Sequence, residues 1–231
     1  MEETLASRVA AVAALDEPTR RLLYEHVVRQ PAPVSRDEVA AALRVPRATV
    51  AFHLDRLVEQ TLLDVTYQRR TGRSGPGAGR PAKLYSRSRH HVAVSLPERR
   101  YDLSGHLLAA AVEEADRTAQ PVRAILGRRA HELGLELGRT RAAEDDEPTA
   151  EGVLGALEAH GFEPRTDGDR ILLGNCPFHA LAQEHTQLVC GMNLSLLTGL
   201  LHGLGHTGLT AHLDPAPGRC CVLLEPDRGS D

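Results

Sequence analysis

The residues best suited to chemistry are four cysteines near the end of the chain. All of them lie within the last 56 of 231 residues, at Cys176, Cys190, Cys220 and Cys221. The chain begins Met1-Glu2-Glu3, with acids where a secretory leader carries basic residues, so we expect a cytoplasmic protein. In a reducing compartment, clustered cysteines indicate metal or redox chemistry more often than disulfide bonds.

The spacing of the cysteines favours an iron–sulfur cluster. Structural zinc sites use ligand pairs a few residues apart, whereas 13 residues separate Cys176 from Cys190 and 29 separate Cys190 from Cys220. Thiolates that converge from separate elements suit a cluster, whose sulfide framework spans more space than one ion. Zinc and buried inert cysteines remain the alternatives. Neighbouring side chains of a strand point in opposite directions, so Cys221 competes with Cys220 for the third position.

Histidines near the cysteines are candidates for a further ligand. His179 follows Cys176 by three residues, and His185 is also close in sequence. A lone histidine is more often a surface residue than a ligand, so the fourth ligand stays open among His179, His185 and Cys221. A looser set of histidines, expected to be solvated, lies further along at His202, His206 and His212.

A second candidate site is a basic surface in the first part of the chain. Residues 1–90 carry a net charge of +5 and residues 91–231 carry −9, which together give the overall −4. A helix predicted from Arg47 to about Gln60 presents short or hydrogen-bonding side chains flanked by arginine, a combination that suits base edges and phosphates. The residues that we expect to contact DNA are Arg47, Thr49, His53 and Arg56 on this helix, and Arg70, Arg73, Arg80 and Lys83 on the hairpin after it.

The elements around this surface follow a recognisable order. A helix from Asp16 to Arg29 has Asp16 as its expected N-cap, and a second helix opens with a capping box formed by Ser35 and Glu38. The helix from Arg47 follows after a tight turn. Two strands, at residues 63–67 and 83–85, then flank a glycine-rich tip. Three helices and a hairpin in this order predict a winged helix-turn-helix.

The sequence predicts an α+β protein in three parts: a winged helix-turn-helix domain at 1–92, a helical linker and dimerisation segment at 93–147, and an α/β sensor module at 148–231. The middle part has two apolar helical stripes within 97–142, and palindrome-reading proteins need two copies. The last part has helix 149–160 capped by Thr149, a hairpin, a helix from about Thr186 to Leu204, and strands at 209–213 and 220–225. Apolar stretches are broken well before membrane-spanning length, so no membrane segment is expected.

Four short segments carry a resemblance to a known family. They are Gly79-Arg80-Pro81-Ala82-Lys83-Leu84-Tyr85, Asn175-Cys176-Pro177-Phe178, Leu188-Val189-Cys190 and Pro217-Gly218-Arg219-Cys220. With the predicted winged helix, they resemble the SufR group of ArsR/DeoR-like regulators, repressors of iron–sulfur cluster assembly (suf) operons. The resemblance implies a homodimer on an operator and a cluster, 4Fe–4S rather than 2Fe–2S, held by Cys176, Cys190 and Cys220, with Cys221 or His179 as less certain ligands.

Two other functions are consistent with the residues. The first is a zinc-responsive or thiol-redox-responsive transcription regulator on the same scaffold. The second is an enzyme that pairs Cys190 with His179 or His185 as nucleophile and base. No third residue that would orient such a pair is visible in the sequence, so we expect neither catalysis nor a small-molecule substrate.

Overall fold

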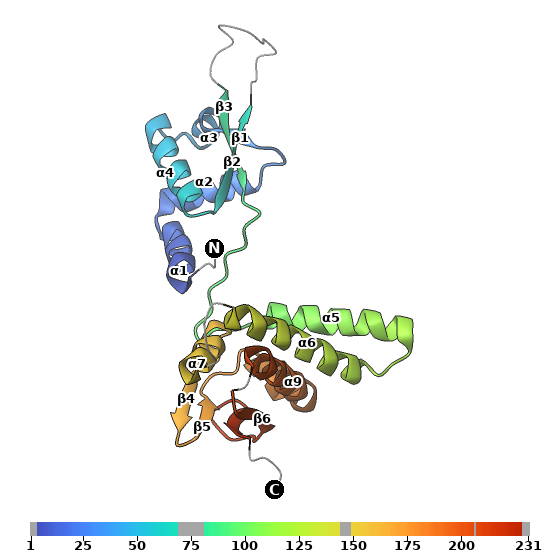
Figure 1. Cartoon of the computed structure of the whole chain (residues 1–231). Helices are drawn as coiled ribbons and strands as arrows, with labels where there is room; N and C mark the ends of the chain where they lie inside the picture. Colours follow the sequence, from blue (N-terminus) through green and yellow to red (C-terminus); the bar gives the residue numbers. More distant parts are fainter. Residues whose placement is uncertain (1–3, 69–80, 144–148, 206, 228–231) are drawn as a thin grey trace. The chain divides into compact units, whose positions relative to one another are not determined.

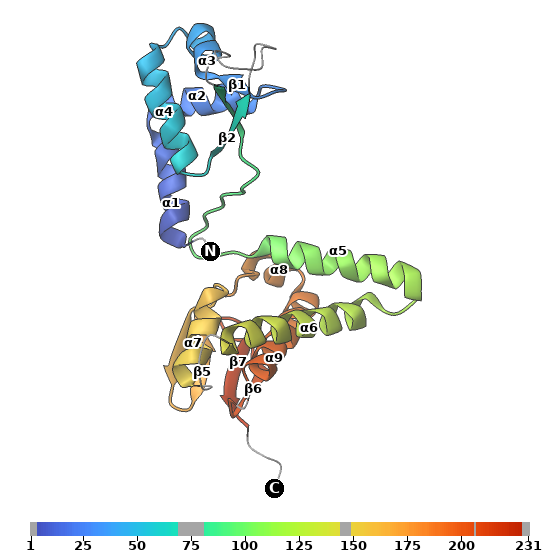
Figure 2. The same ribbon diagram turned by 45° about the horizontal axis from the view of Figure 1, so that its top comes forward.

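The structure, a computed structural model, describes residues 4–68, 81–143, 149–205 and 207–227. It divides into two compact units, Met1–Val94 (unit 1) and Ser95–Asp231 (unit 2), each with its own hydrophobic core (Figures 1 and 2). The sequence predicts three parts, but the helices of 93–147 share one core with 148–231. That core is continuous because both expected parts supply buried side chains to it, among them Ile125 and Leu126 from one and Leu197 and Leu200 from the other.

Each α-helix of unit 1 except the last begins at a residue whose side chain caps it. They are α1 (Leu5–Ala13), a 3-10 turn (Ala14–Asp16), α2 (Pro18–Val28), α3 (Arg36–Leu43) and α4 (Arg47–Glu59). Ser35 and Glu38 form the expected capping box at α3. The expected cap of α2 is wrong by one residue. Asp16 belongs to the 3-10 turn, and the carboxylate of Glu17 accepts the backbone N–H groups of Thr19 and Arg20.

A small sheet completes unit 1. The strands are β1 (Val34–Ser35), β2 (Leu63–Gln68) and β3 (Ala82–Arg87), in the order β1-β3-β2 with both pairs antiparallel. The predicted hairpin strands are confirmed, whereas β1 is too short to show a pattern in the sequence. Helices α2, α3 and α4 pack over a core that includes the fully buried Leu23, Val39, Val50, Leu54 and Leu57.

Unit 2 has five helices and a four-stranded sheet among its described residues. The helices are α5 (Tyr101–Thr118), α6 (Val122–Ala142), α7 (Ala150–Ala159), α8 (His179–Glu184) and α9 (Thr186–Leu204). The strands are β4 (Pro164–Asp167), β5 (Arg170–Leu173), β6 (Leu209–Leu213) and β7 (Val222–Pro226), in the antiparallel order β4-β5-β7-β6. Helix α6 lies between α5 and α9, and α9 packs on the sheet (Figure 1).

Glycines bring the backbones of α6 and α9 into direct contact. A Cβ atom built on Gly134 of α6 would lie 2.0 Å from the carbonyl oxygen of Leu196, and one on Gly199 of α9 would lie 2.1 Å from that of His131. Gly138 and Gly203 meet each other in the same way one turn further along. No side chain larger than hydrogen fits at these crossing points, so the glycines fix how closely the two helices approach.

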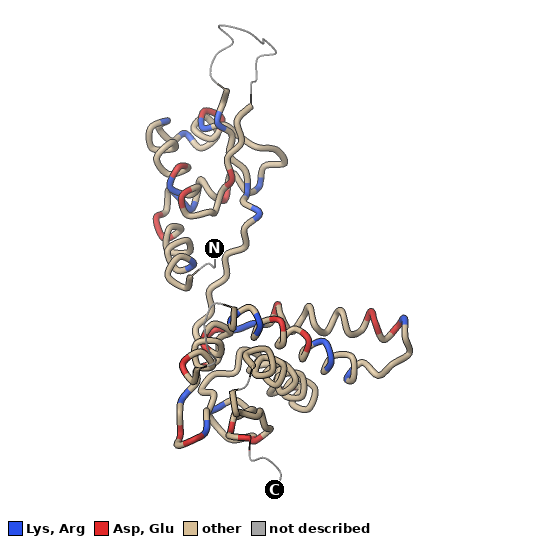
Figure 3. Tube along the Cα trace, viewed as in Figure 1, with Lys and Arg blue, Asp and Glu red and all other residues tan. Residues whose placement is uncertain are grey.

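Helix α9 is the central helix of unit 2. It has no charged residue, and its trace is uniformly uncharged in Figure 3. Among the described residues it is the one helix whose length and composition would allow it to cross a membrane. However, 56% of its most apolar 18-residue stretch is buried inside the unit. The core helices of soluble proteins have the same character, so this property alone does not indicate a membrane span.

Candidate DNA interface and cysteine centre

Helix α4 presents a mixed surface of arginine, small residues and one aromatic ring. Arg47 and Arg56 are exposed, and Thr49 is half-buried. Phe52 is 65% exposed, although sequence reasoning did not single it out. The expected hairpin contacts Arg70, Arg73 and Arg80 lie outside the described residues.

The expected outward position of His53 is wrong. His53 is only 9% exposed, and its Nδ1 atom lies 3.5 Å from Oε2 of Glu17, the residue that caps α2. His53 follows Val50 by three residues and precedes Leu57 by four, so it lies on the buried face of the helix. The structure therefore gives His53 a role in packing α4 onto the start of α2.

The basic residues of this surface are held in ion pairs with neighbouring acids. Arg47 lies 3.3 Å from Asp37 of α3, and Arg56 lies 2.8 Å from Glu59. These pairs are exposed, where an ion pair contributes little stability and a phosphate can replace the carboxylate.

Lys83 is held more firmly than the arginines, because Asp55 of α4 binds both its ammonium group and the hydroxyl of Tyr85. Partial burial opposes the charge of Lys83, but the hydrogen bond and the charge of Asp55 outweigh it and raise the pKa of Lys83. Asp55 thus links strand β3 of the hairpin to helix α4. An open groove runs between these two elements and α3, and its lining includes Ser35, Asp37, Ala51, Tyr67 and Lys83.

Comparison with known proteins agrees with this geometry. Residues 15–66 match the family described as a helix-turn-helix domain. No curated protein and no solved structure matches the chain. The matched residues run from the 3-10 turn after α1 through α4 into β2. Within them α3 and α4, separated by a short turn, stand in the order of a helix-turn-helix pair, the second helix of which is the recognition helix in known examples.

The helix-turn-helix match supports a DNA-binding unit of the kind found in transcription regulators, and such regulators are usually not enzymes. The match ends before unit 2, so it gives no information on the chemistry of the cysteines.

The four cysteines form two pairs, linked through the consecutive residues Cys220 and Cys221, and we call these four residues the cysteine centre. Cys176 lies in the loop after β5, Cys190 in the first turns of α9, and Cys220 and Cys221 directly before β7. Cys190 and Cys221 form a disulfide, with their Cα atoms 6.4 Å apart. Cys176 and Cys220 are free thiols joined by a hydrogen bond. The sequence leaves Cys221 as a competitor of Cys220, and in the structure each of the two belongs to a different pair.

Cys220 is the most enclosed of the free thiols. It is 1% exposed, and its sulfur accepts hydrogen bonds from the side-chain amide of Asn193, at 3.3 Å, and from the backbone N–H of Val222, at 3.5 Å. Asn193 is itself fully buried, and within the described part of the chain its Oδ1 atom has no hydrogen-bond partner. The burial of the Asn193 amide beside the sulfur of Cys220 could not be predicted from the sequence.

The loop that carries Cys176 is tied to the first residues of unit 2. The guanidinium of Arg99 donates to Oδ1 of Asn175 and to the carbonyl oxygen of Cys176, the latter at 3.1 Å. The side-chain amide of Asn175 donates to the carbonyl oxygens of Glu98, at 3.0 Å, and Gly161, at 2.7 Å. A further backbone bond joins the N–H of Arg100 to the carbonyl of Pro177. Residues 98–100 are therefore bound directly to the cysteine loop.

The two histidines expected as further ligands, His179 and His185, are exposed, whereas the free cysteines are buried. His179 is the first residue of α8. His202 pairs with His131, with ring nitrogens 3.1 Å apart, and His212 contacts Thr210. His206 lies outside the described residues. Across the described ranges, no group of three or more His, Cys, Asp or Glu side chains is arranged to hold a metal ion.

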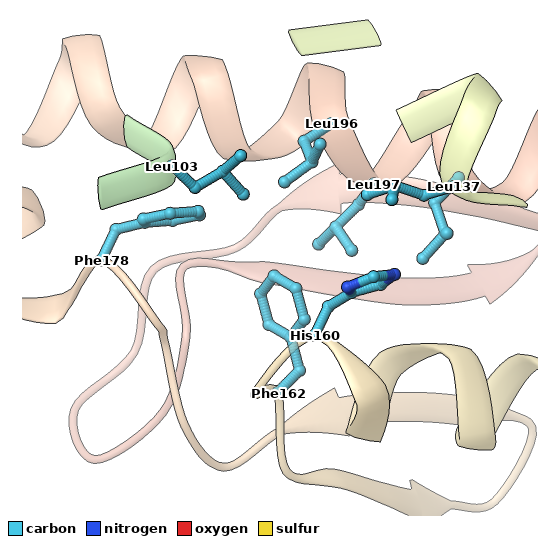
Figure 4. Close-up of a pocket in the computed structure, with 8 residues that line it drawn as sticks. Leu103, Leu137, His160, Phe162, Phe178, Leu196 and Leu197 are labelled. Atoms are coloured by element: carbon cyan, nitrogen blue, oxygen red, sulfur yellow. The ribbon is translucent and has the colours of Figure 1, made fainter. Parts of the chain in front are cut away.

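A small pocket in the core of unit 2 is apolar. Its lining combines Leu103, Leu137, Phe162, Phe178, Leu196 and Leu197 with the ring of His160 (Figure 4). It offers room for about one water molecule, so it is a packing defect of the core rather than a ligand site.

The electrostatics of the free thiols lead to a first prediction. The hydrogen bond from Cys220 lowers the pKa of Cys176 to about 7, helped by the backbone N–H of Phe178 and the charge of Arg99 and opposed by burial. The same hydrogen bond, together with burial, raises the pKa of Cys220. In cluster-free protein with the disulfide intact, we expect ultraviolet thiolate absorbance to rise with a midpoint near pH 7.

Two variants check the assignment of that midpoint. Cys176→Ser should remove it, and Cys220→Ala should move it up towards the ordinary thiol value, because the donated hydrogen bond is lost. The folded pKa of Cys176 is below the unfolded one, so its contribution to stability is present above the unfolded value and is lost as the pH falls through about 7. A midpoint unchanged in Cys220→Ala would contradict the hydrogen bond as the cause.

Proposed function

We propose that the protein is a cytoplasmic, DNA-binding transcription repressor whose unit 2 senses an iron–sulfur cluster and controls cluster-assembly (suf) genes as a homodimer. The helix-turn-helix match supports the DNA-binding part. One observation carries the sensing part: sulfurs from three separate segments of unit 2 pair with one another, Cys176 with Cys220 and Cys190 with Cys221, and the two pairs are linked through the consecutive residues Cys220 and Cys221.

The cysteines fit the ligand set of such a cluster. Four thiolates are the usual protein ligands of a 4Fe–4S or 2Fe–2S cluster, and the centre contains four sulfurs, Cys176, Cys190, Cys220 and Cys221. The disulfide of Cys190 and Cys221 must first take up two electrons and two protons, which a cytosolic dithiol supplies while it becomes a disulfide itself. When bound, the cluster would hold the four sulfurs together and would be lost on oxidation.

The residues around the cysteines stabilise the thiolates and hold the loop that carries Cys176. Asn193 and Val222 donate hydrogen bonds to the sulfur of Cys220 and stabilise its anionic form. Arg99 stabilises the thiolate of Cys176 by its charge and holds the loop through the carbonyl of the same residue. Residues 98–100 follow directly after the boundary at Val94 and Ser95, so the cysteine loop is bonded to the segment by which unit 2 is joined to the DNA-binding unit. A change at the sulfurs would thereby reach the helix-turn-helix.

The disulfide and the low pKa of Cys176 favour a second candidate, a thiol-redox regulator on the same scaffold. In that case the reduced and oxidised cysteines themselves would be the two states. The two candidates differ in colour, because thiols and disulfides do not absorb visible light and iron–sulfur clusters do.

Anaerobic purification tests the proposal. We expect brown protein containing iron and acid-labile sulfide, which binds a DNA duplex selected by the protein from a random library more tightly than the cluster-free form does. Cys176→Ser should lose the visible absorption and at least tenfold in DNA affinity, whereas the matched variant His179→Ala, whose side chain is exposed, should keep both.

The opposite results would decide against the cluster. Cys176→Ser protein that stays brown and keeps its affinity would overturn the ligand assignment. Colourless wild-type protein whose affinity changes reversibly with a dithiol would establish the thiol-redox candidate instead.

A further inference from the structure

The recognition helix exposes an aromatic ring that the fold does not use. Phe52 of α4 is 65% exposed, whereas Val50, Leu54 and Leu57 on the opposite face are completely buried. Among the described residues its one aromatic contact is a T-shaped one with the ring of His53, at 5.2 Å between ring centroids. The core of unit 1 is therefore closed without Phe52, and stability gives no reason for a large apolar side chain at this position.

The position of the ring within α4 points to a function. Ala48, exposed one turn earlier, extends the apolar surface towards the start of the helix. Exposed arginines stand at the two ends of this surface, Arg47 in the first turn and Arg56 in the last turns. An apolar strip between cationic side chains complements DNA, in which phosphates flank the base edges of the groove.

The chemistry of the bases leaves one group in the major groove that suits the apolar ring of Phe52. The recognition helix of a helix-turn-helix lies in the major groove, where hydrogen-bond donors and acceptors cover nearly every base edge. The 5-methyl group of thymine is the apolar exception. Single exposed apolar residues are common on protein surfaces, so exposure alone would not assign a role. Here the exposed ring lies on the second helix of the matched helix-turn-helix, on the face turned away from the core.

We propose that Phe52 determines sequence specificity by packing against the 5-methyl group of a thymine in the operator, with Ala48 leaving room for the neighbouring base. The proposal rests on the DNA-binding part of the proposed function and is independent of the cluster. It predicts that the operator contains a thymine whose methyl group, and not its hydrogen-bonding edge, is recognised.

The test uses the full-length protein and duplexes selected by it from a random library. Each thymine is replaced in turn by deoxyuridine, which removes only the methyl group, and dissociation constants are measured by fluorescence anisotropy at one fixed salt concentration. Wild-type protein should lose about three- to fivefold in affinity at one thymine per half-site, as expected for one buried methyl group. Phe52→Ala should lose at least as much on the thymine duplex and nothing further when that thymine becomes deoxyuridine.

A matched control is Leu22→Ala, because Leu22 is also a large exposed apolar residue of unit 1 but lies on α2. It should keep both the affinity and the response to deoxyuridine. The proposal is overturned if Phe52→Ala binds like the wild type, or if it loses the same factor on every duplex and still responds to deoxyuridine. Failure of the wild-type protein to select any DNA would instead refute the proposed function, and the proposal with it.

Discussion

Gly134→Ala is expected to lower the free energy of unfolding of unit 2 by about 3 kcal/mol or more. The added methyl group would lie 2.0 Å from the carbonyl oxygen of Leu196 and 2.8 Å from the amide nitrogen of Leu200. Both neighbours are backbone atoms of α9, which cannot rotate away as a side chain would. Helices α6 and α9 would have to separate, and the buried contacts between them would be lost along their length.

Gly199→Ala should have a similar effect, because its Cβ atom would meet the backbone of His131 from the other side. The matched controls are Gly105→Ala in α5 and Gly191→Ala in α9, where nothing lies within 4 Å of the added atom. Alanine favours a helix over glycine by up to about 1 kcal/mol, so these controls should be neutral or slightly stabilising. Urea unfolding followed by circular dichroism measures all four variants. Equal stabilities of Gly134→Ala and Gly191→Ala would show that the two helices do not touch through their backbones.

The sequence predicts the elements of unit 1 best where a local chemical signal marks them. The capping box at Ser35 and Glu38 and the turn before Arg47 depend on neighbouring residues, so they can be recognised without tertiary contacts. The burial of His53 can also be predicted from the sequence, because its spacing from Val50 and Leu57 places it on the buried face of the helix. Strand β1 could not be predicted, since two residues have no periodicity and pair only because β3 lies beside them.

The centre in unit 2 depends on contacts between distant residues. The sequence indicates that cysteines gather there, but which sulfur meets which depends on α9 packing against the sheet and on the path of the chain before β7. Arg99 precedes Cys176 by 77 residues, and no local pattern links them. The four-residue spacing of Gly134 and Gly138, repeated in Gly199 and Gly203, is the one sequence signal of the close helix pair, and it becomes meaningful only when the two helices are known to cross.

Asn175→Ala is expected to destabilise unit 2 by about 3 kcal/mol and to uncouple the cysteine centre from DNA binding. Asn175 is 5% exposed, and it joins three segments by donating to the carbonyls of Glu98 and Gly161 and accepting from Arg99. Its removal takes away the hydrogen bonds that Asn175 makes to Glu98, Gly161 and Arg99 and loosens the attachment of residues 98–100, which then rests on the bonds of Arg99 to Cys176 and of Arg100 to Pro177. The measurements are urea unfolding and the ratio of DNA affinities with and without the cluster, which should fall towards one.

A double-mutant cycle with Arg99→Met distinguishes this tether from general damage to the fold. If Asn175 and Arg99 act as one unit, the double variant should be little less stable than either single variant, and the affinity ratio should fall equally in all three. Asn175→Asp provides the intermediate case, because a carboxylate still accepts from Arg99 but cannot donate to Glu98 and Gly161. Strictly additive losses, with an unchanged affinity ratio, would mean that Asn175 supports the fold without carrying the signal, and the coupling would then have to pass through another part of unit 2.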